Sequence, residues 1–255
     1  MWSVLGLGAL QGLTEFLPIS SSGHLIVLKT MLGVASPGAA LEVALHLGTL
    51  AAVLWAYRRW IKRWLKELAG GARSAWRLLG LLAAASVPAA IAGVLLGRVV
   101  EQYFTVGAVA VGWLCTSALL WTTPIGTNGR PLEQIRWWQA AAIGCAQALA
   151  LWPGLSRSGT TIAMARAVGV QGEDAAQFSF LMAIPAVVGA SLFEFGAMRH
   201  PGVSWPLLIL AASLAAVTGA VAIQWVKGFV QRSRAWRAMG IYTAAAAVAV
   251  WIIGG

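Results

Sequence analysis

The chain has 255 residues, of which 59% are hydrophobic and only 10% are charged, and its mean hydropathy is +0.77. This composition leaves too little polar surface to cover a soluble globule of that size, so it indicates an integral membrane protein. The formal net charge of +10 does not indicate a nucleic-acid partner, because 14 of the 18 Lys and Arg fall in a few loops between apolar runs, as in helical membrane proteins.

The first apolar region, Val4 to Met31, carries polar residues in its middle. The stretch QGLTEFLPISSSGHLIVL holds a carboxylate (Glu15), three consecutive serines and a histidine (His24). Pro18 and Gly23 interrupt the apolar run, and we expect the helix to break at both. Broken backbone is tolerated at membrane depth only where protein or a watery cavity satisfies its polar groups. The region therefore predicts a re-entrant hairpin of two half-helices.

Six other segments are long and apolar enough to span a bilayer, for which about 17 to 25 residues are needed. They are Leu41 to Tyr57, Trp76 to Gly97, Phe104 to Trp121, Ala175 to Gly196, Trp205 to Val226 and Ala238 to Ile253. The sequence thus predicts an all-α integral membrane protein, with six transmembrane helices and two re-entrant helical hairpins in a single domain over residues 1–255.

The second hairpin is predicted at Trp137 to Val168, where Pro153, Gly154 and Gly159 break the apolar run. It matches the first hairpin at an offset of 136 residues, which places Gln11 on Gln147, Ser20 on Ser156, Ser22 on Ser158 and Gly23 on Gly159. We interpret this match as an internal repeat, with copies at about 1–122 and 137–255. Each copy contains one hairpin, which returns to its own side, and three spans. Because three crossings are an odd number, the second copy is inverted relative to the first. In proteins with inverted repeats, binding sites form near the midplane of the membrane, where the repeats meet.

Basic residues divide unevenly between the two sides of this topology. One side carries Arg58, Arg59, Lys62, Arg63, Lys66, Arg73, Arg77, Arg130, Arg136, Arg166, Lys227, Arg232, Arg234 and Arg237, and the other only Lys29, Arg98 and Arg199. The positive-inside rule makes the first side cytoplasmic and places both termini outside. The basic loop from Tyr57 to Arg77 is interpreted as the topological anchor; an amphipathic helix that binds anionic lipid is the alternative.

Three ionisable groups, Glu15, His24 and Arg157, fall close to the breaks in the two hairpins. Each costs about 2.5 to 3.5 kcal/mol at bilayer depth, so we expect them to face one another or a wet cavity. In both PISSSGHL and PGLSRSGTT, we expect one helix to end and the next to begin at small hydroxyl residues. Helix N-termini, serine hydroxyls and guanidinium groups all bind phosphate. Two such anion-binding segments around one arginine suit a diphosphate head group whose tail stays in the membrane.

The residues expected to contact the head group are Gln11, Ser20, Ser22, Gly23, Ser156, Ser158, Gly159 and Thr161. Hydrolysis also needs a nucleophile and a proton acceptor, which a serine beside His24 would supply. Glu15 would orient His24 or hold a divalent cation, either Mg²⁺ or Ca²⁺. Glu42 and His46 share a helix face but are expected mainly to pack, and Glu194 and His200 are expected at the interface.

The sequence resembles the undecaprenyl-diphosphate phosphatase family, the BacA or UppP type linked to bacitracin resistance. QGLTEFLPISSSGHL is similar to that family's [E/Q]GxTEFLPxSSxGH motif, and PGLSRSGTT is similar to its PGxSRSGxT motif. The resemblance covers nearly the whole chain. It implies hydrolysis of undecaprenyl diphosphate to the monophosphate carrier lipid of peptidoglycan synthesis, at the outer face of the bacterial plasma membrane and with a divalent cation.

Carried onto this chain, the resemblance assigns a role to each matching position. It implies that Glu15 is the essential acidic residue, that Ser21 is the nucleophile, and that His24 is the family's histidine. Ser156 and Arg157 match its phosphate-binding serine and arginine. Gln11 stands where other members have glutamate, so Glu15 would hold a cation together with substrate oxygens and water.

Three other interpretations compete with this one. A PAP2-type phosphatase needs a histidine and an aspartate after its Ser-Arg pair, and those positions hold Ala163 and Ala167. A transporter that moves a polyprenyl phosphate without cleaving it also suits inverted repeats, but it would need no nucleophile. A scaffold leaves the buried ionisable groups unexplained. Small-residue spacings at Gly8 to Gly12 and Gly93 to Gly97 are expected to pack helices and leave a homodimer open.

Overall fold

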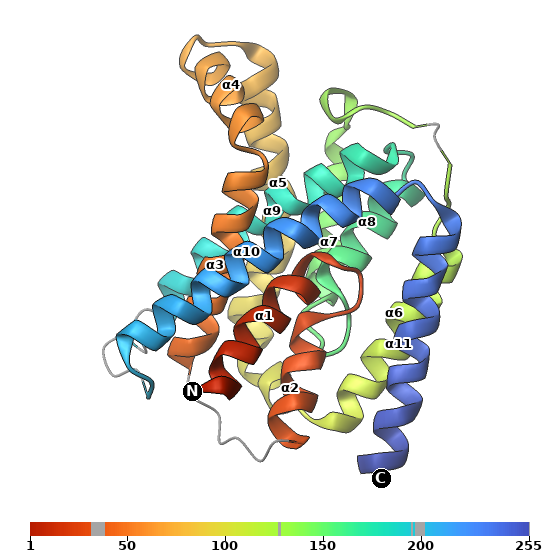
Figure 1. Ribbon diagram of the computed structural model, residues 1–255. Coiled ribbons are helices and arrows are strands. Elements are labelled where there is room, and N and C mark those ends of the chain that lie inside the picture. Colours follow the sequence, from red (N-terminus) through yellow and green to blue (C-terminus); the bar gives the residue numbers. More distant parts are fainter. Residues whose placement is uncertain (32–38, 127–128, 195, 197–201, 255) are drawn as a thin grey trace.

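The computed structural model describes residues 1–31, 39–126, 129–194, 196 and 202–254, and the regular elements within these ranges are helices. In chain order they are α1 (Trp2–Phe16), α2 (Ser21–Met31), α3 (Ala39–Ala56), α4 (Arg58–Ala69), α5 (Arg73–Glu101), α6 (Val106–Thr122), the short 3₁₀ helix η1 (Leu132–Gln134), α7 (Trp137–Leu149), α8 (Arg157–Ala167), α9 (Gly172–Phe193), α10 (Trp205–Phe229) and α11 (Ser233–Gly254). The prediction of an all-α protein is confirmed (Figure 1).

In the part of the chain that the structure describes, five helices are long and apolar enough to cross a membrane: α3, α5, α9, α10 and α11. The sixth predicted span is α6, an apolar helix of 17 residues. The α5 helix is longer than predicted at both ends, with 29 residues. At about 1.5 Å per residue it exceeds the roughly 30 Å of a bilayer's hydrocarbon core. Its first turns and α4 stand out together at one end of the molecule (Figure 1).

Both predicted hairpins form, but their breaks are narrower than expected. The α1 helix ends at Phe16, just before Pro18, and α2 begins at Ser21. The break between α7 and α8 contains Pro153 and Gly154. The predictions that Gly23 and Gly159 also break the chain are wrong, because both lie inside helices.

Gly23 and Gly159 are explained by close packing rather than by helix breaking. A Cβ atom at Gly23 would lie 2.9 Å from the indole Nε1 of Trp113. A Cβ atom at Gly159 would lie 3.1 Å from the Ser156 side chain and 3.2 Å from that of Pro18. Because glycine has no side chain, α2 can pack closely against Trp113, and α8 can pack closely against Pro18 of the first hairpin.

The packing of α1 and α7 supports the internal repeat. The α1 helix packs along α10, and α7 packs along α5. A Cβ atom at Gly8 would lie 2.5 Å from the Ala211 carbonyl oxygen, and one at Gly144 would lie 2.3 Å from that of Ala85. Gly8 and Gly144 are 136 residues apart, the offset that also relates the two polar motifs. Each copy of the hairpin is thus packed against the other copy's span by the same kind of backbone contact.

The two hairpins point in opposite directions. In Figure 1 the turn between α1 and α2 lies toward the end that carries α4, and the loop between α7 and α8 lies toward the opposite end. Phe16, the last residue of α1, packs edge-on against Phe180 of α9, with ring centroids 5.3 Å apart. This contact anchors the first break against the buried core. That the hairpins are re-entrant in a membrane stays a prediction.

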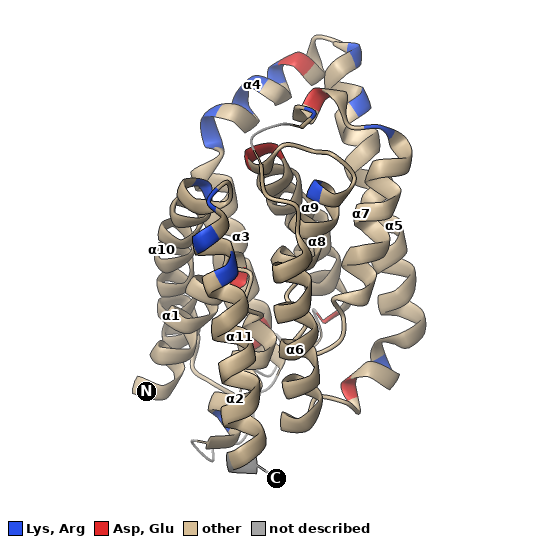
Figure 2. Cartoon of the chain, turned by 90° about the vertical axis from the view of Figure 1, so that its right-hand side faces the viewer, with Lys and Arg blue, Asp and Glu red and all other residues tan. Residues whose placement is uncertain are grey.

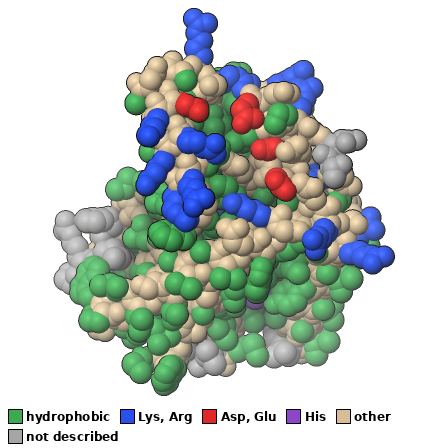
Figure 3. All heavy atoms as spheres, turned by 45° about the horizontal axis from the view of Figure 1, so that its top comes forward, with side chains coloured by type: hydrophobic (Ala, Val, Ile, Leu, Met, Phe, Trp, Pro, Cys, Tyr) green, Lys and Arg blue, Asp and Glu red, His purple; other side chains and the backbone are tan. Residues whose placement is uncertain are grey.

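The charge distribution is as uneven in space as it is in the sequence. Lys and Arg gather at the end that carries α4 (Figure 2), and the space-filling view of that end shows them above a largely hydrophobic body (Figure 3). Both chain ends lie at the opposite end (Figure 1). The basic loop is a helix over Arg58–Ala69 with no buried residue. Binding of anionic lipid by this helix stays a prediction.

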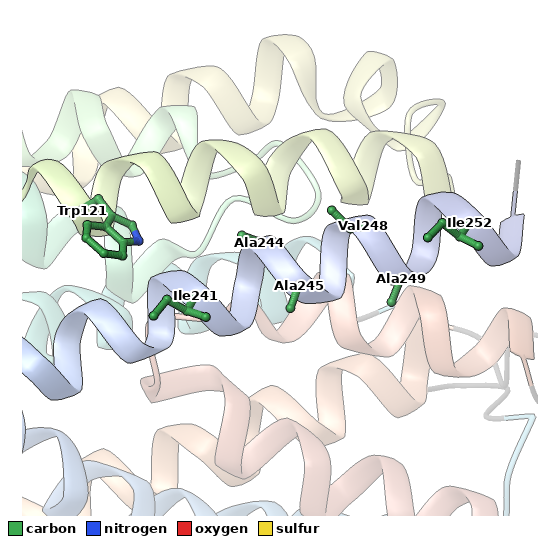
Figure 4. A pocket seen from close by; sticks show the side chains of 7 residues that line it. All are labelled: Trp121, Ile241, Ala244, Ala245, Val248, Ala249 and Ile252. Atoms are coloured by element: carbon green, nitrogen blue, oxygen red, sulfur yellow. The ribbon is translucent and has the colours of Figure 1, made fainter.

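An apolar depression of about 700 Å³ lies on the outside of α11 beside Trp121 (Figure 4). Its lining consists of Trp121, Ile241, Ala244, Ala245, Val248, Ala249 and Ile252. With no polar group to bind phosphate, this depression is not the candidate site. Such a surface suits contact with acyl chains.

Candidate active site

The carboxylate of Glu15 is the centre of the polar cluster between the hairpins. Its Oε2 accepts hydrogen bonds from Gln11 Nε2 at 3.0 Å and from Ser21 Oγ at 2.5 Å. Its Oε1 accepts one from Arg157 Nη2 at 2.6 Å. Glu15 is only 7% exposed, so its charge is compensated inside the protein by partners from α1, α2 and α8. The predicted meeting of Glu15 and Arg157 is present in the structure.

Each hairpin restarts its second helix with the same serine cap. Ser156 Oγ accepts from the Gly159 N–H at 3.1 Å and lies 3.2 Å from Ser158 Oγ. In the first hairpin, Ser20 Oγ accepts from the Gly23 N–H at 3.3 Å and lies 3.2 Å from Ser22 Oγ. A side-chain oxygen thus satisfies one of the free N–H groups of each helix start. The Ser-x-Ser-Gly repeat in the sequence therefore reflects a repeated local structure.

The first break is held in a strained conformation. Ser20 has a φ angle of 68°, in the left-handed region that serine rarely adopts. The carbonyl oxygen of the preceding residue, Ile19, accepts a hydrogen bond from Trp113 Nε1 of α6 at 2.9 Å. Strained backbone of this kind persists where surrounding contacts enforce it, and it concentrates at functional sites. The strain places Ser21 directly at the start of α2, beside Glu15.

The α6 helix also holds the second break. Thr116 Oγ1 donates to the Gly154 carbonyl at 2.9 Å and accepts from the Ser156 N–H at 3.0 Å. Ser158 Oγ then donates to the Leu17 carbonyl at 3.0 Å, which joins the two hairpins directly. Trp113 and Thr116 were not predicted as site residues. Their only signal in the sequence was an indole and a hydroxyl inside an apolar span.

One guanidinium nitrogen is left free by the ion pair. Arg157 Nη1 is buried, and it has no hydrogen-bond partner among the described residues. Gln11 Oε1 and both polar atoms of Gln147 share this property. Buried polar atoms without protein partners indicate bound water or a ligand. Arg157 can thus donate to a phosphate oxygen while it keeps its contact with Glu15.

Comparison with known proteins assigns the family. The family model described as "Bacitracin resistance protein BacA" matches residues 4–249. The chain belongs to the BacA family. Curated relatives that it resembles are named undecaprenyl-diphosphatase. The protein from Desulfatibacillum aliphaticivorans is 37% identical over 254 residues, 91% of each chain, and that from Syntrophotalea carbinolica is 42% identical over 260 residues, 98% of this chain and 94% of the relative.

The serine and the histidine of this BacA-family chain make separate contacts. Ser21 Oγ bonds to Glu15, whereas the His24 ring bonds to the Ser20 carbonyl oxygen through Nδ1 at 2.6 Å and to the Tyr242 hydroxyl through Nε2 at 2.7 Å. In the structure, Ser21 is therefore hydrogen-bonded to the Glu15 carboxylate and not to the His24 ring. Tyr242 was not predicted, since it lies on an apolar helix and 218 residues from His24.

Other candidate residues have partners within the fold. Thr161 Oγ1 donates to the Arg157 carbonyl at 2.7 Å and lies 2.6 Å from Ser179 Oγ, so it packs α8 against α9. Glu42 forms an ion pair with Lys29, and His46 Nδ1 bonds to the Glu42 carbonyl at 2.8 Å. This agrees with the packing role expected for Glu42 and His46. Arg199 and His200 lie outside the described residues.

The described residues of the site supply few ligands for a metal ion when no substrate is bound. Among the described residues, no group of three or more His, Cys, Asp or Glu side chains could hold one. Glu15 supplies a single carboxylate, with hydroxyl groups beside it. Mg²⁺ accepts one or two carboxylates when substrate phosphate oxygens and water complete its coordination. The residues present fit a cation that binds together with the diphosphate.

Proposed function

We propose that this chain hydrolyses undecaprenyl diphosphate to undecaprenyl phosphate and inorganic phosphate. The observation that carries the proposal is the Ser21–Glu15–Arg157 cluster, which joins a hydroxyl, a carboxylate and a guanidinium from both hairpins of a BacA-family chain. Its relatives are named for this activity. Family membership further supports a role in recycling the carrier lipid for peptidoglycan synthesis and in bacitracin resistance.

In the first step of this proposal, Ser21 attacks the terminal phosphorus. The hydrogen bond of 2.5 Å orients its hydroxyl proton toward Glu15, which accepts the proton as the Ser21 oxygen bonds to phosphorus. The bond from phosphorus to the bridging oxygen breaks, and undecaprenyl phosphate leaves with that electron pair. Arg157 neutralises phosphate charge through its free Nη1. The starts of α2 and α8 present N–H donors to the same anion.

In the second step, water hydrolyses the phosphoserine. The water needs a base, and His24 is the imidazole that the first hairpin supplies. Its contacts with Ser20 and Tyr242 leave it separate from the Ser21–Glu15 pair. We assign the proton of the attacking water to His24. The bond from phosphorus to the Ser21 oxygen breaks, Glu15 returns to that oxygen the proton it took in the first step, and inorganic phosphate leaves. Ser20, Ser22, Gly23, Ser156, Ser158 and Gly159 shape the phosphate-binding segments in this scheme.

A divalent cation, either Mg²⁺ or Ca²⁺, is part of the proposal. Glu15 would hold it together with substrate oxygens, and the cation would neutralise charge on the phosphates. The physical reason is that a diphosphate brings more negative charge than Arg157 alone can balance beside a carboxylate. Loss of activity in a chelator, and its recovery on adding Mg²⁺ or Ca²⁺, would support this part of the proposal.

We place the protein in the bacterial plasma membrane, with both termini and the opening of the site on the outer face. The position of the basic residues around α4 and of both termini at the opposite end supports this orientation (Figures 1 and 2). A homodimer stays a prediction. Gly8 and Gly12 pack on α10 within the chain, whereas a Cβ atom at Gly93 or Gly97 would meet no other atom, which leaves that face of α5 open to a second copy.

The deciding experiment measures inorganic phosphate released from defined lipid diphosphates by the purified protein, with and without chelator. Phosphate release supports the proposed function. The rival function is a transporter for polyprenyl phosphates. Reconstituted vesicles that move the lipid across the bilayer while releasing no phosphate would favour the transporter.

A further inference from the structure

The His24 ring is held by two hydrogen bonds from opposite ends of the chain. Its Nδ1 lies 2.6 Å from the Ser20 carbonyl oxygen, and its Nε2 lies 2.7 Å from the Tyr242 hydroxyl on α11. The His24 and Tyr242 rings are also stacked, with centroids 5.7 Å apart and an interplanar angle of 2°. Tyr242 of α11 therefore both hydrogen-bonds to the His24 ring and stacks on it.

These contacts select one tautomer of the imidazole. A carbonyl oxygen only accepts hydrogen bonds, so the contact with Ser20 requires the proton on Nδ1. The lone pair of the neutral ring then lies on Nε2, where it accepts the Tyr242 O–H. The nitrogen that can take a proton is thus the one that Tyr242 holds.

A second aromatic residue confines the same ring. Trp113 of α6 packs edge-on against His24, with centroids 4.9 Å apart and an interplanar angle of 61°. Its indole N–H is already bonded to the Ile19 carbonyl. Trp113 therefore contributes packing alone to the ring, and the Tyr242 hydroxyl is the side-chain group that hydrogen-bonds to it.

We infer that Tyr242 positions His24: its hydroxyl donates to the Nε2 lone pair that the Ser20 contact leaves basic, and its ring fixes the plane of the imidazole. The inference rests on the proposed function for its kinetic consequence. Its structural part is independent of that function. Because its O–H occupies the Nε2 lone pair, Tyr242 passes its proton to Nε2 as its oxygen accepts the proton of the water that attacks the phosphoserine. Tyr242 ends the step unchanged, and His24 gains one proton.

The tautomer is measured by ¹⁵N nuclear magnetic resonance of histidine-labelled protein in detergent. The His24 signals are assigned by their loss in His24→Ala. Both the wild type and Tyr242→Phe are expected in the Nδ1–H form, which the Ser20 carbonyl holds. Because Tyr242→Phe keeps the ring but loses the donor, its Nε2 signal is expected to shift to that of a lone pair without a hydrogen bond. An unchanged Nε2 signal in Tyr242→Phe would overturn the inference.

The kinetic arm compares Tyr242→Phe with Tyr103→Phe. Tyr103 is a matched control because it is 48% exposed, as Tyr242 is 45% exposed, and it packs on an aromatic side chain, Trp152. We expect kcat to fall about 5- to 20-fold in Tyr242→Phe, less than the roughly 100-fold or more of a general base itself because His24 remains, with KM changed less than about twofold. Tyr103→Phe should keep wild-type kcat. Equal kcat in both variants contradicts a positioning role for the hydroxyl.

The two arms separate failure of the inference from failure of the proposed function. If the wild type releases no phosphate from any lipid diphosphate, the proposed function fails, and the Nε2 signal of His24 still tests the role of Tyr242. If the wild type is active and Tyr242→Phe changes neither the Nε2 signal nor kcat, the proposed function stands and the inference fails.

Discussion

Arg157 at the start of α8 donates to Glu15 near the end of α1 across 2.6 Å, although 142 residues separate them in the chain. This ion pair is the direct link between the charged groups of the two hairpins. It is mostly buried, with 20% of the Arg157 side chain and 6% of the Glu15 side chain exposed. Loss of the ion pair should therefore lower both the stability of the fold and the rate of phosphate release. Each of these two quantities can be measured independently.

Removing one partner of the pair should destabilise the fold. Arg157→Ala leaves the Glu15 carboxylate buried without its cation, which costs about 3 to 5 kcal/mol in comparable buried pairs. The double variant Glu15→Gln with Arg157→Gln removes both charges and should recover much of the lost thermal stability, measured in detergent, but no activity. A double variant that is no more stable than Arg157→Ala would contradict the pairing.

The three consecutive serines should differ in their effects. Ser21→Ala is expected to lower the rate of phosphate release at least about 100-fold, because it removes the hydroxyl that Glu15 activates. Ser22→Ala is the matched control, since Ser22 Oγ contacts only Ser20 Oγ among the described residues. Its rate should fall about 10-fold at most, because the variant alters a phosphate-binding segment but removes no reacting group. Equal losses in the two variants would contradict Ser21 as the nucleophile.

The equivalent glycine contacts predict a stability difference. Gly144→Ala places a Cβ atom 2.3 Å from the Ala85 carbonyl oxygen, so α5 and α7 must move apart. Overpacking of this kind costs about 1 to 3 kcal/mol. Gly93→Ala, where a Cβ atom meets nothing within 4 Å, should leave the melting temperature equal or higher because alanine favours helix. A normal melting temperature for Gly144→Ala would mean that the helices are not in contact there.

The proposed orientation is tested by cysteine labelling in intact cells. Ala69→Cys lies at the end of α4, and Gln102→Cys follows the other end of α5; both positions are exposed. The native Cys115 and Cys145 are first replaced by alanine. A membrane-impermeant maleimide should label Gln102→Cys at once and Ala69→Cys only after the cells are permeabilised. Labelling in the reverse order would invert the topology.

The sequence predicted what is local or periodic. Hydropathy located a helix at each of the six predicted spans, five of which are long and apolar enough to cross a membrane among the described residues. The Ser-x-Ser-Gly repeat located the serine caps of both hairpins, because each cap is formed within four residues. The roles of Gly23 and Gly159 were misjudged, since a glycine that permits close packing and one that breaks a helix look alike without the neighbouring Trp113 or Pro18.

The contacts that complete the site could not be predicted, because they join distant segments. Trp113 and Thr116 look like ordinary span residues until α6 is packed against both breaks. Tyr242 carries no motif, and only the placement of α11 brings its hydroxyl to His24. The pairing of Ser21 with Glu15 likewise depends on the strained backbone at Ser20, which its residue type does not indicate.

The most direct test is the rate of phosphate release from undecaprenyl diphosphate by purified Arg157→Ala, in protein shown to be folded by its elution in gel filtration. The central claim is that groups from both hairpins act on one phosphate, so loss of the second hairpin's only charged contact with Glu15 should lower the rate at least about 100-fold. Turnover close to that of the wild type would contradict it.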